Sequence, residues 1–142
     1  MPPIEMDPDN LNIVVEKVCF IIARARQVDV KDVLTDEGDS SNATDDNALE
    51  ALEDVPDDLS RQELADAIRA LNEDERLDLI ALARLGMEDG PVIWGEMRAE
   101  AEVVEADEGA VRYLLGLPLL ADYLEEGLDR FGLSCDGVDN AV

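Results

Sequence analysis

Four carboxylates near the C-terminal end of the chain recur at helical spacing: Asp122, Glu125, Glu126 and Asp129. This spacing places all four side chains on one face of a helix. Such a row offers the oxygen ligands that hard divalent cations prefer, and it also attracts a basic protein surface. Acids on a single helix do not surround an ion, however, and no neighbouring turn supplies backbone carbonyls. We therefore assign no metal site and keep the row as a candidate partner surface, with a solvated helix face as the plain alternative.

A second acidic face is predicted on the helix expected over residues 92–106. Glu96 and Glu100 lie one turn apart on it, and they extend the candidate partner surface. The other face of this helix carries Trp94 and Met97. Trp is common at interface hot spots, but a stripe at this spacing is more typical of a protein core.

The charge balance excludes several classes of function. The chain has 142 residues, with 36 acidic and 11 basic side chains and no histidine, which gives a net charge of −25. Such a surface repels nucleic acid and anionic lipid, because phosphates are bound by lysine and arginine. Without histidine the chain lacks the commonest acid–base group near neutral pH and the commonest metal ligand. No phosphate loop, dinucleotide fingerprint or nucleophile elbow is present, so we assign no catalytic or cofactor-binding residue and expect no cofactor.

The two cysteines, Cys19 and Cys135, form neither a CxxC motif nor a metal-ligand pattern. The N-terminal residues 1–10 lack the basic and apolar regions of a signal peptide, and the longest apolar run, 18–23, is too short to cross a bilayer. We therefore expect a cytoplasmic protein with no membrane partner and with free thiols. Cys19 lies in an apolar helix and is interpreted as core, whereas Cys135 is a candidate reactive thiol. A disulfide between them requires the last segment to fold back onto the first helix.

The apolar residues recur at helical rather than strand spacing, which predicts a single all-α domain over residues 1–142. We expect a compact bundle of about five to six helices. Its predicted parts are a first helix over 10–27, a mobile acidic loop over 36–58, a helical core over 59–135 and a disordered tail over 136–142. The acidic loop holds ten acids and no base, and a short helix is expected within it over 47–53.

Local signals predict five helices within the core segment. Ser60 with Glu63 and Asn72 with Glu75 each have the spacing of a capping box. Gly127 interrupts a good helix at a cost of about 1 kcal/mol, which indicates that another backbone approaches it closely. The expected helices cover 61–71, 73–85, 92–106, 109–115 and 119–131, and the second of these is apolar around most of its circumference and is therefore central.

Several blocks together resemble a known family. They are residues 16–22, 41–46, 71–75 and, most specifically, 113–127, whose sequence is YLLGLPLLADYLEEG. In this combination the chain resembles the bacterial family of uncharacterised domains DUF3775, over about residues 11–135. The resemblance implies a bacterial, alphaproteobacterial origin and brings no activity, cofactor or site residue. The chain departs from the family pattern at 84–89, where a basic position in a turn is replaced.

These observations favour a non-catalytic interaction or regulatory module that binds a basic protein partner, without direct contact to nucleic acid. Two alternatives remain open: a small carboxylate- or metal-dependent enzyme, and a nucleic-acid mimic whose carboxylates imitate phosphates. A homo-oligomer is a further expectation. The first helix is the only net-positive stretch, and it would dock onto the acidic remainder either within one chain or between two.

Overall fold

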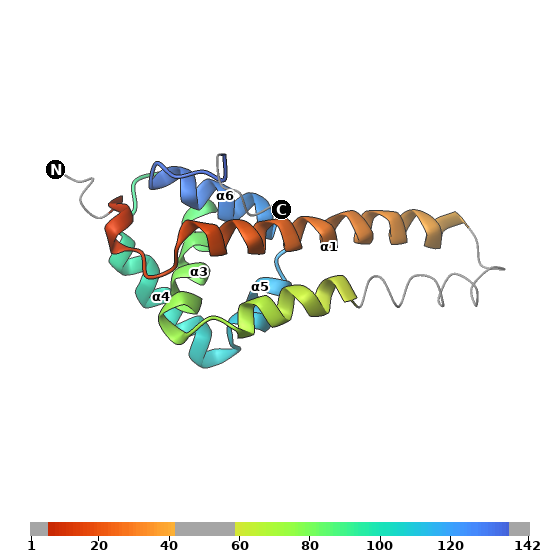
Figure 1. Ribbon diagram of the computed structural model, residues 1–142, viewed down its shortest axis with the longest axis horizontal. Helices are drawn as coiled ribbons and strands as arrows, with labels where there is room; N and C mark the ends of the chain where they lie inside the picture. Colours follow the sequence, from red (N-terminus) through yellow and green to blue (C-terminus); the bar gives the residue numbers. More distant parts are fainter. Residues whose placement is uncertain (1–5, 42–58, 137–142) are drawn as a thin grey trace.

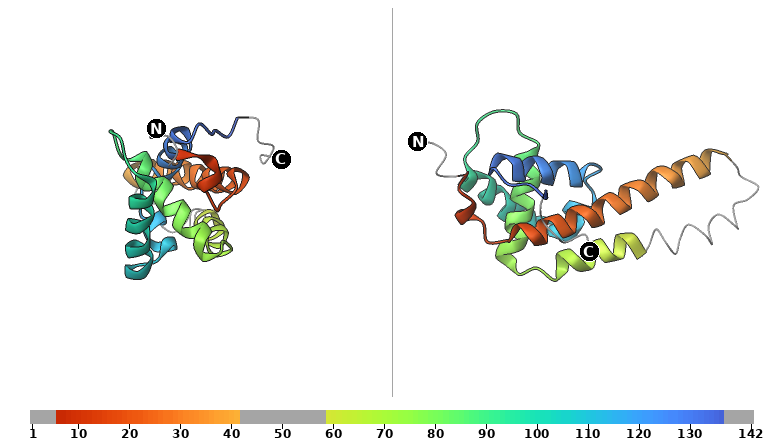
Figure 2. Two further views of the ribbon diagram at one scale, coloured as in Figure 1. Left: turned by 90° about the vertical axis from the view of Figure 1, so that its left-hand side faces the viewer. Right: turned by 45° about the horizontal axis from the view of Figure 1, so that its top comes forward.

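The computed structural model describes residues 6–41 and 59–136, with side chains over 6–29 and 59–136. All regular elements in these ranges are helices, as Figures 1 and 2 show, so the predicted all-α bundle is confirmed. Besides a helical segment over 59–69, the elements are η2 (Pro8–Asn10), α1 (Val15–Ser41), α3 (Glu73–Gly86), α4 (Trp94–Asp107), α5 (Ala110–Leu115) and α6 (Leu120–Arg130).

The first helix differs from its predicted range of 10–27 at both ends. It begins only at Val15, and before it Asp7 caps the short turn η2 with a 2.9 Å hydrogen bond from the Asp9 N–H. It continues to Ser41. The helix contains no proline, and its one glycine, Gly38, lies in the last turn. Residues 36–41, predicted as the start of a loop, are therefore helical.

Other predictions on the acidic segment and the tail cannot be compared with the structure. The remainder of the predicted loop, 42–58, with its short helix over 47–53, lies outside the described residues. The same holds for 137–142 of the predicted tail.

Helix α3 is the centre of the bundle, as its apolar circumference predicted. The five consecutive side chains from Leu79 to Ala83 have no exposed surface, and α4 and α6 both pack against this helix. Its predicted capping box is confirmed. The Asn72 side chain accepts from the Glu75 N–H at 2.8 Å, and the Glu75 carboxylate accepts from the Asn72 N–H at 2.9 Å. The box predicted at Ser60 is wrong, because Leu59 and Ser60 are already helical.

Helices α3 and α6 approach each other at two glycines. A Cβ atom at Gly127 would overlap the carbonyl group of Leu82, and one at Gly86 would overlap that of Tyr123. These two contacts are one helical turn apart on each helix, so the backbones touch along a full turn. The predicted close approach at Gly127 is confirmed. Gly86, at the last position of α3, has the same packing role.

The aromatic residues close one end of the core. Trp94 at the start of α4 and Phe131 after α6 form a T-shaped pair with ring centroids 4.9 Å apart. Trp94 and Met97 are both buried, which confirms the interpretation of this stripe as core.

We predict that Gly127→Ala destabilises the fold by about 2 kcal/mol or more, because the added methyl group must push two backbones apart. Gly95→Ala is the matched control. Gly95 lies in the first turn of α4, where a Cβ atom meets nothing within 4 Å, so this change should not destabilise the fold. Urea unfolding of both variants measures the difference, and equal effects would contradict the close contact.

Candidate functional site

Helix α1 carries cations that bind acids on three other elements. Lys17 pairs with Glu75 of α3 at 2.7 Å, and Arg24 pairs with Glu63 of the 59–69 segment at 2.6 Å. The third cation, Arg26, reaches α6. The net-positive helix therefore docks on the acidic remainder within one chain, which is one of the two arrangements that the sequence allowed.

The predicted row on α6 is divided by this docking. Asp122 and Glu125 bind the Arg26 guanidinium at 3.3 and 2.6 Å, and these contacts raise the pKa of Arg26, with the hydrogen bond to Glu125 as the largest cause. Glu126 and Asp129 have no ion-pair partner among the described residues. Half of the predicted row on α6 is thus occupied by the chain's own Arg26.

The free part of the row lines a groove, which we call the acidic groove. It has a volume of about 390 Å³ and lies between α6 and the segment that follows it. Four carboxylates line it together with two leucines, of which Leu128 is fully buried. The lining residues are Glu125, Glu126, Leu128, Asp129, Leu133, Ser134, Cys135 and Asp136.

The second wall of the acidic groove is fixed by backbone geometry and by a disulfide. Gly132 adopts a φ of 76°, which turns the chain back after α6, and the Leu133 N–H donates to the Leu128 carbonyl at 2.9 Å. Cys135 is then joined to Cys19 of α1, with their Cα atoms 5.7 Å apart. The predicted reactive thiol at Cys135 is therefore wrong for this structure. The last segment does fold back onto the first helix, which was the stated condition for a disulfide.

The other two predicted surface residues lie outside the acidic groove. Glu100 on α4 accepts from Arg84 of α3 at 2.9 Å, and Arg84 also donates to the Tyr113 hydroxyl at 3.1 Å. Glu96 is exposed on the same helix. The structure does not join these two acids to the lining of the groove.

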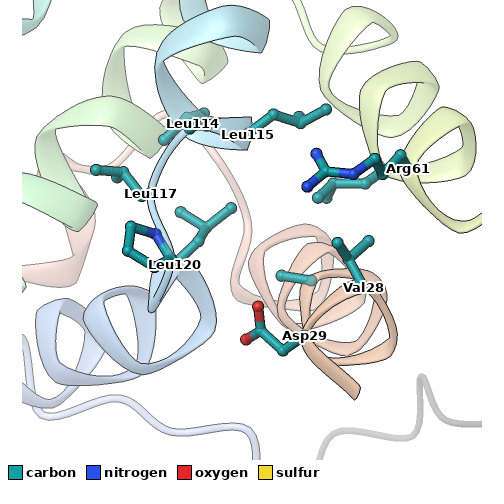
Figure 3. A pocket seen from close by; sticks show the side chains of 11 residues that line it. Val28, Asp29, Arg61, Leu114, Leu115, Leu117 and Leu120 are labelled. Atoms are coloured by element: carbon teal, nitrogen blue, oxygen red, sulfur yellow. The ribbon is translucent and has the colours of Figure 1, made fainter. Parts of the chain in front are cut away.

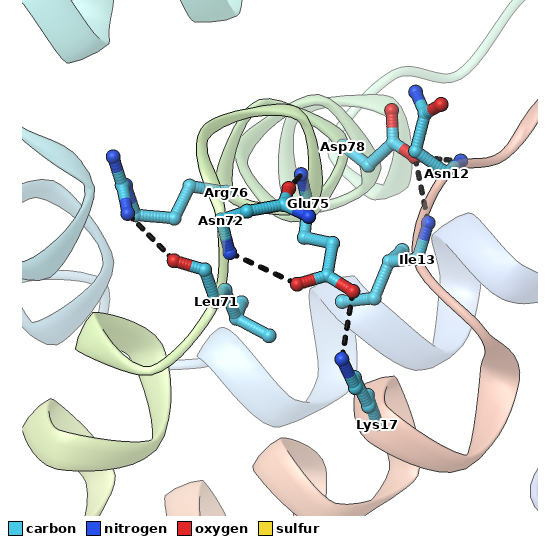
Figure 4. Close-up of polar contacts among 8 residues, drawn as sticks. All are labelled: Asn12, Ile13, Lys17, Leu71, Asn72, Glu75, Arg76 and Asp78. Carbon is cyan, nitrogen blue, oxygen red and sulfur yellow. Dashed lines mark hydrogen bonds and ion pairs between the residues drawn. The ribbon is translucent and has the colours of Figure 1, made fainter.

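Sequence analysis missed the most buried acid, Asp78 of α3, which has no exposed surface. Its carboxylate accepts from the backbone N–H groups of Asn12 and Ile13 and from Arg98, the last at 2.7 Å; Figure 4 shows the two backbone contacts. Burial raises the pKa of Asp78, while the backbone N–H groups and Arg98 oppose that rise. Because both oxygens of its carboxylate have partners, Asp78 anchors the chain before α1 to α3 and α4.

Glu75 lies one turn before Asp78 and joins the start of α3 to α1 (Figure 4). Its carboxylate accepts from Lys17 Nζ at 2.7 Å and from the Asn72 N–H. These two hydrogen bonds, the Lys17 contact first, lower the pKa of Glu75 below its ordinary value of 4.5. The ionised carboxylate of Glu75 is therefore more stable in the folded state than in the unfolded chain.

A smaller cavity of about 200 Å³ lies between α1, the 59–69 segment and the end of α5 (Figure 3). Its wall is mainly leucine, and Asp29 and Arg61 extend toward it from α1 and from the 59–69 segment. No cysteine, serine, threonine or lysine lines it. Across the described residues no group of three acids or cysteines is placed to hold a metal ion.

The fold and the acidic groove define a class of protein: an acidic helical bundle with an anionic groove at one helix. A sequence model of proteins of unknown function, DUF3775, matches residues 61–133, just over half of the 142 residues. The chain belongs to this family. The match is shorter than the predicted resemblance over 11–135 and leaves α1 outside.

Comparisons with curated proteins and with solved structures give no match. Among the described residues, no helix combines the length and apolar character that crossing a bilayer requires.

We predict that Glu75→Gln lowers stability in a pH-dependent way. Because the pKa of Glu75 is lowered in the folded state, its contribution is present above about pH 5 and disappears as pH falls through the lowered pKa. The variant should lose about 0.5–1 kcal/mol at neutral pH and approach the wild type in acid. Glu73→Gln, an exposed change in the same helical turn, is the control for loss of one charge. Identical pH profiles of urea unfolding for the two variants would contradict the Lys17–Glu75 pair.

We predict that Cys135→Ser lowers the free energy of unfolding by about 2–5 kcal/mol, because the cross-link closes a loop of 116 residues. A dithiol reductant should bring the wild type to the same stability and leave the variant unchanged. Intact mass, lower by two hydrogens in the oxidised wild type, reports the bond directly. If the reductant does not change the free energy of unfolding of the wild type, the cross-link is ruled out.

Proposed function

We propose that the chain is a non-catalytic interaction module that binds a basic segment of a protein partner in the acidic groove. The observation that supports this most is the composition of the groove, in which four carboxylates and the partly exposed Leu133 line one recess. Lysine and arginine side chains have an apolar stem and a charged head. Leu133 suits the stem, and the carboxylates suit the head.

The carboxylates differ in their availability for a partner. Glu125 shares the Arg26 guanidinium with Asp122, so its charge is partly compensated. Glu126, Asp129 and Asp136 take part in no ion pair with another described residue. These three acids would carry the binding, and arginine would gain more than lysine because its planar guanidinium binds a carboxylate through two hydrogen bonds.

The rest of the molecule assists the encounter. A net charge of −25 raises the rate at which a cationic partner approaches, and this effect weakens with salt. The nucleic-acid mimic gains less support than a basic-segment module. A mimic requires a continuous ridge of carboxylates, and the α6 row is interrupted where Arg26 binds two of its members.

The cytoplasmic location and the bacterial origin stay predictions. A disulfide between Cys19 and Cys135 is more typical of an oxidising compartment than of the cytosol. The redox state of these cysteines in the native host would therefore test the cytoplasmic location of the protein, and with it the compartment in which a partner is met.

We predict that a fluorescein-labelled peptide rich in arginine binds the full chain at low salt. The double variant Glu126→Gln/Asp129→Asn should weaken binding about three- to tenfold, because it removes two partly exposed charge contacts worth about 0.5 kcal/mol each. Fluorescence anisotropy measures the Kd.

Glu102→Gln/Asp107→Asn is the matched control, since it removes the same charge from exposed positions on α4. The control should weaken binding less than twofold. An equal loss in both double variants would show that the peptide responds to net charge and not to the groove, and no binding by the wild type at low salt would overturn the proposed function.

A further inference from the structure

A second groove, apolar in character, lies between α1 and the 59–69 segment, which run side by side (Figure 1). Its volume is about 390 Å³. We call it the Phe20 groove, because Phe20 stands at its side with 44% of its surface exposed, although large apolar side chains are normally covered. The lining residues are Glu16, Lys17, Phe20, Ile21, Ala67, Ala70 and Leu71.

The Phe20 ring is held in place by a neighbouring side chain and still remains partly exposed. The Arg24 guanidinium lies over it, 5.2 Å from the ring centroid, and Arg24 itself is fixed by its 2.6 Å ion pair with Glu63. Opposite, the small side chains Ala67 and Ala70 leave the groove open. The chain therefore presents an ordered aromatic side chain beside a recess, which is the arrangement of an anchor and its pocket.

The charge around the Phe20 groove is nearly balanced, unlike the rest of the molecule. Two cations and three carboxylates line it, lie over Phe20 or pair with those residues, which gives a net charge of −1. By contrast, α4 holds five acids and one arginine, and α6 holds four acids and one arginine. The five charged residues at the Phe20 groove are Lys17, Arg24, Glu16, Glu63 and Glu75.

We propose that the Phe20 groove binds the same groove of a second copy of this chain. Two chains that each carry 25 surplus negative charges repel where their acidic faces meet, so association is opposed least where the local charge is nearly balanced. A basic partner is instead drawn to the acidic surfaces. In a twofold arrangement each patch meets its own copy, so Phe20 of one chain packs on Ala67 and Ala70 of the other.

This dimer and the proposed function respond to salt in opposite directions. Raising salt from about 0.1 M to about 1 M shortens the screening length from about 10 Å to about 3 Å. Screening removes repulsion between two acidic copies, so the dimer should tighten, whereas binding of a basic segment should weaken. Sedimentation of the full chain over a wide concentration range at both salt levels measures the dimer. Either proposal can therefore fail without the other.

Two variants with one control locate the interface. Phe20→Glu should weaken the dimer at least about tenfold, as expected for an aromatic anchor. Val103→Glu adds the same charge at another exposed apolar residue, 67% exposed on α4, and should change the dimer little. Ala70→Arg lowers the net negative charge and yet should weaken the dimer, because it fills the groove. Circular dichroism checks that each variant is folded.

A chain that stays monomeric at about 1 M salt, where repulsion is screened, overturns the proposal. So does a dimer that Phe20→Glu and Val103→Glu weaken equally, or one that Ala70→Arg strengthens. A monomeric chain whose binding of the arginine-rich peptide is lost in Phe20→Glu but not in Val103→Glu would assign the groove to a basic partner instead.

Discussion

The ion pairs between helices determine which acids of this molecule are neutralised at helix junctions and which remain exposed at its surface. Arg26 of α1 binds acids of α6, Arg84 of α3 binds Glu100 of α4, and Arg98 of α4 binds Asp78 of α3. Each exposed pair contributes little free energy. Together, however, they place scarce cations at helix junctions in a chain with 36 acids and 11 bases. The unpaired acids are left facing solvent, which is the condition on which the proposed partner binding depends.

The core of the bundle depends on aliphatic side chains and close backbone packing rather than on aromatic rings. Aromatic residues make up only 4% of the chain, so little of the core volume comes from rings. The two glycines at the α3–α6 crossing bring the helices close enough for leucine and alanine to fill the interior. Because α6 is fixed in this way, its outer face and the turn at Gly132 have defined positions, and the acidic groove between them has a defined shape.

Sequence reasoning succeeded where the signal was local. The capping box at Asn72, the close approach at Gly127 and the helical class all follow from short-range patterns. It failed where a distant partner decides: the start of α1 depends on Asp78, which is 66 residues away from Asn12. The division of the acidic row depends on Arg26, and the state of Cys135 depends on Cys19. No periodicity in a single sequence reports such pairings.

Helix α1 connects the two proposed surfaces, although it lies outside the family match over 61–133. One side of α1 carries Cys19, which through Cys135 holds the second wall of the acidic groove. Another side carries Phe20, which lines the apolar groove. Both surfaces require α1: without it the acidic groove would lose the disulfide that holds its second wall, and the Phe20 groove would lose its aromatic side chain. The binding properties proposed for this chain therefore reside in how α1 docks, while the matched core supplies the frame on which it does so.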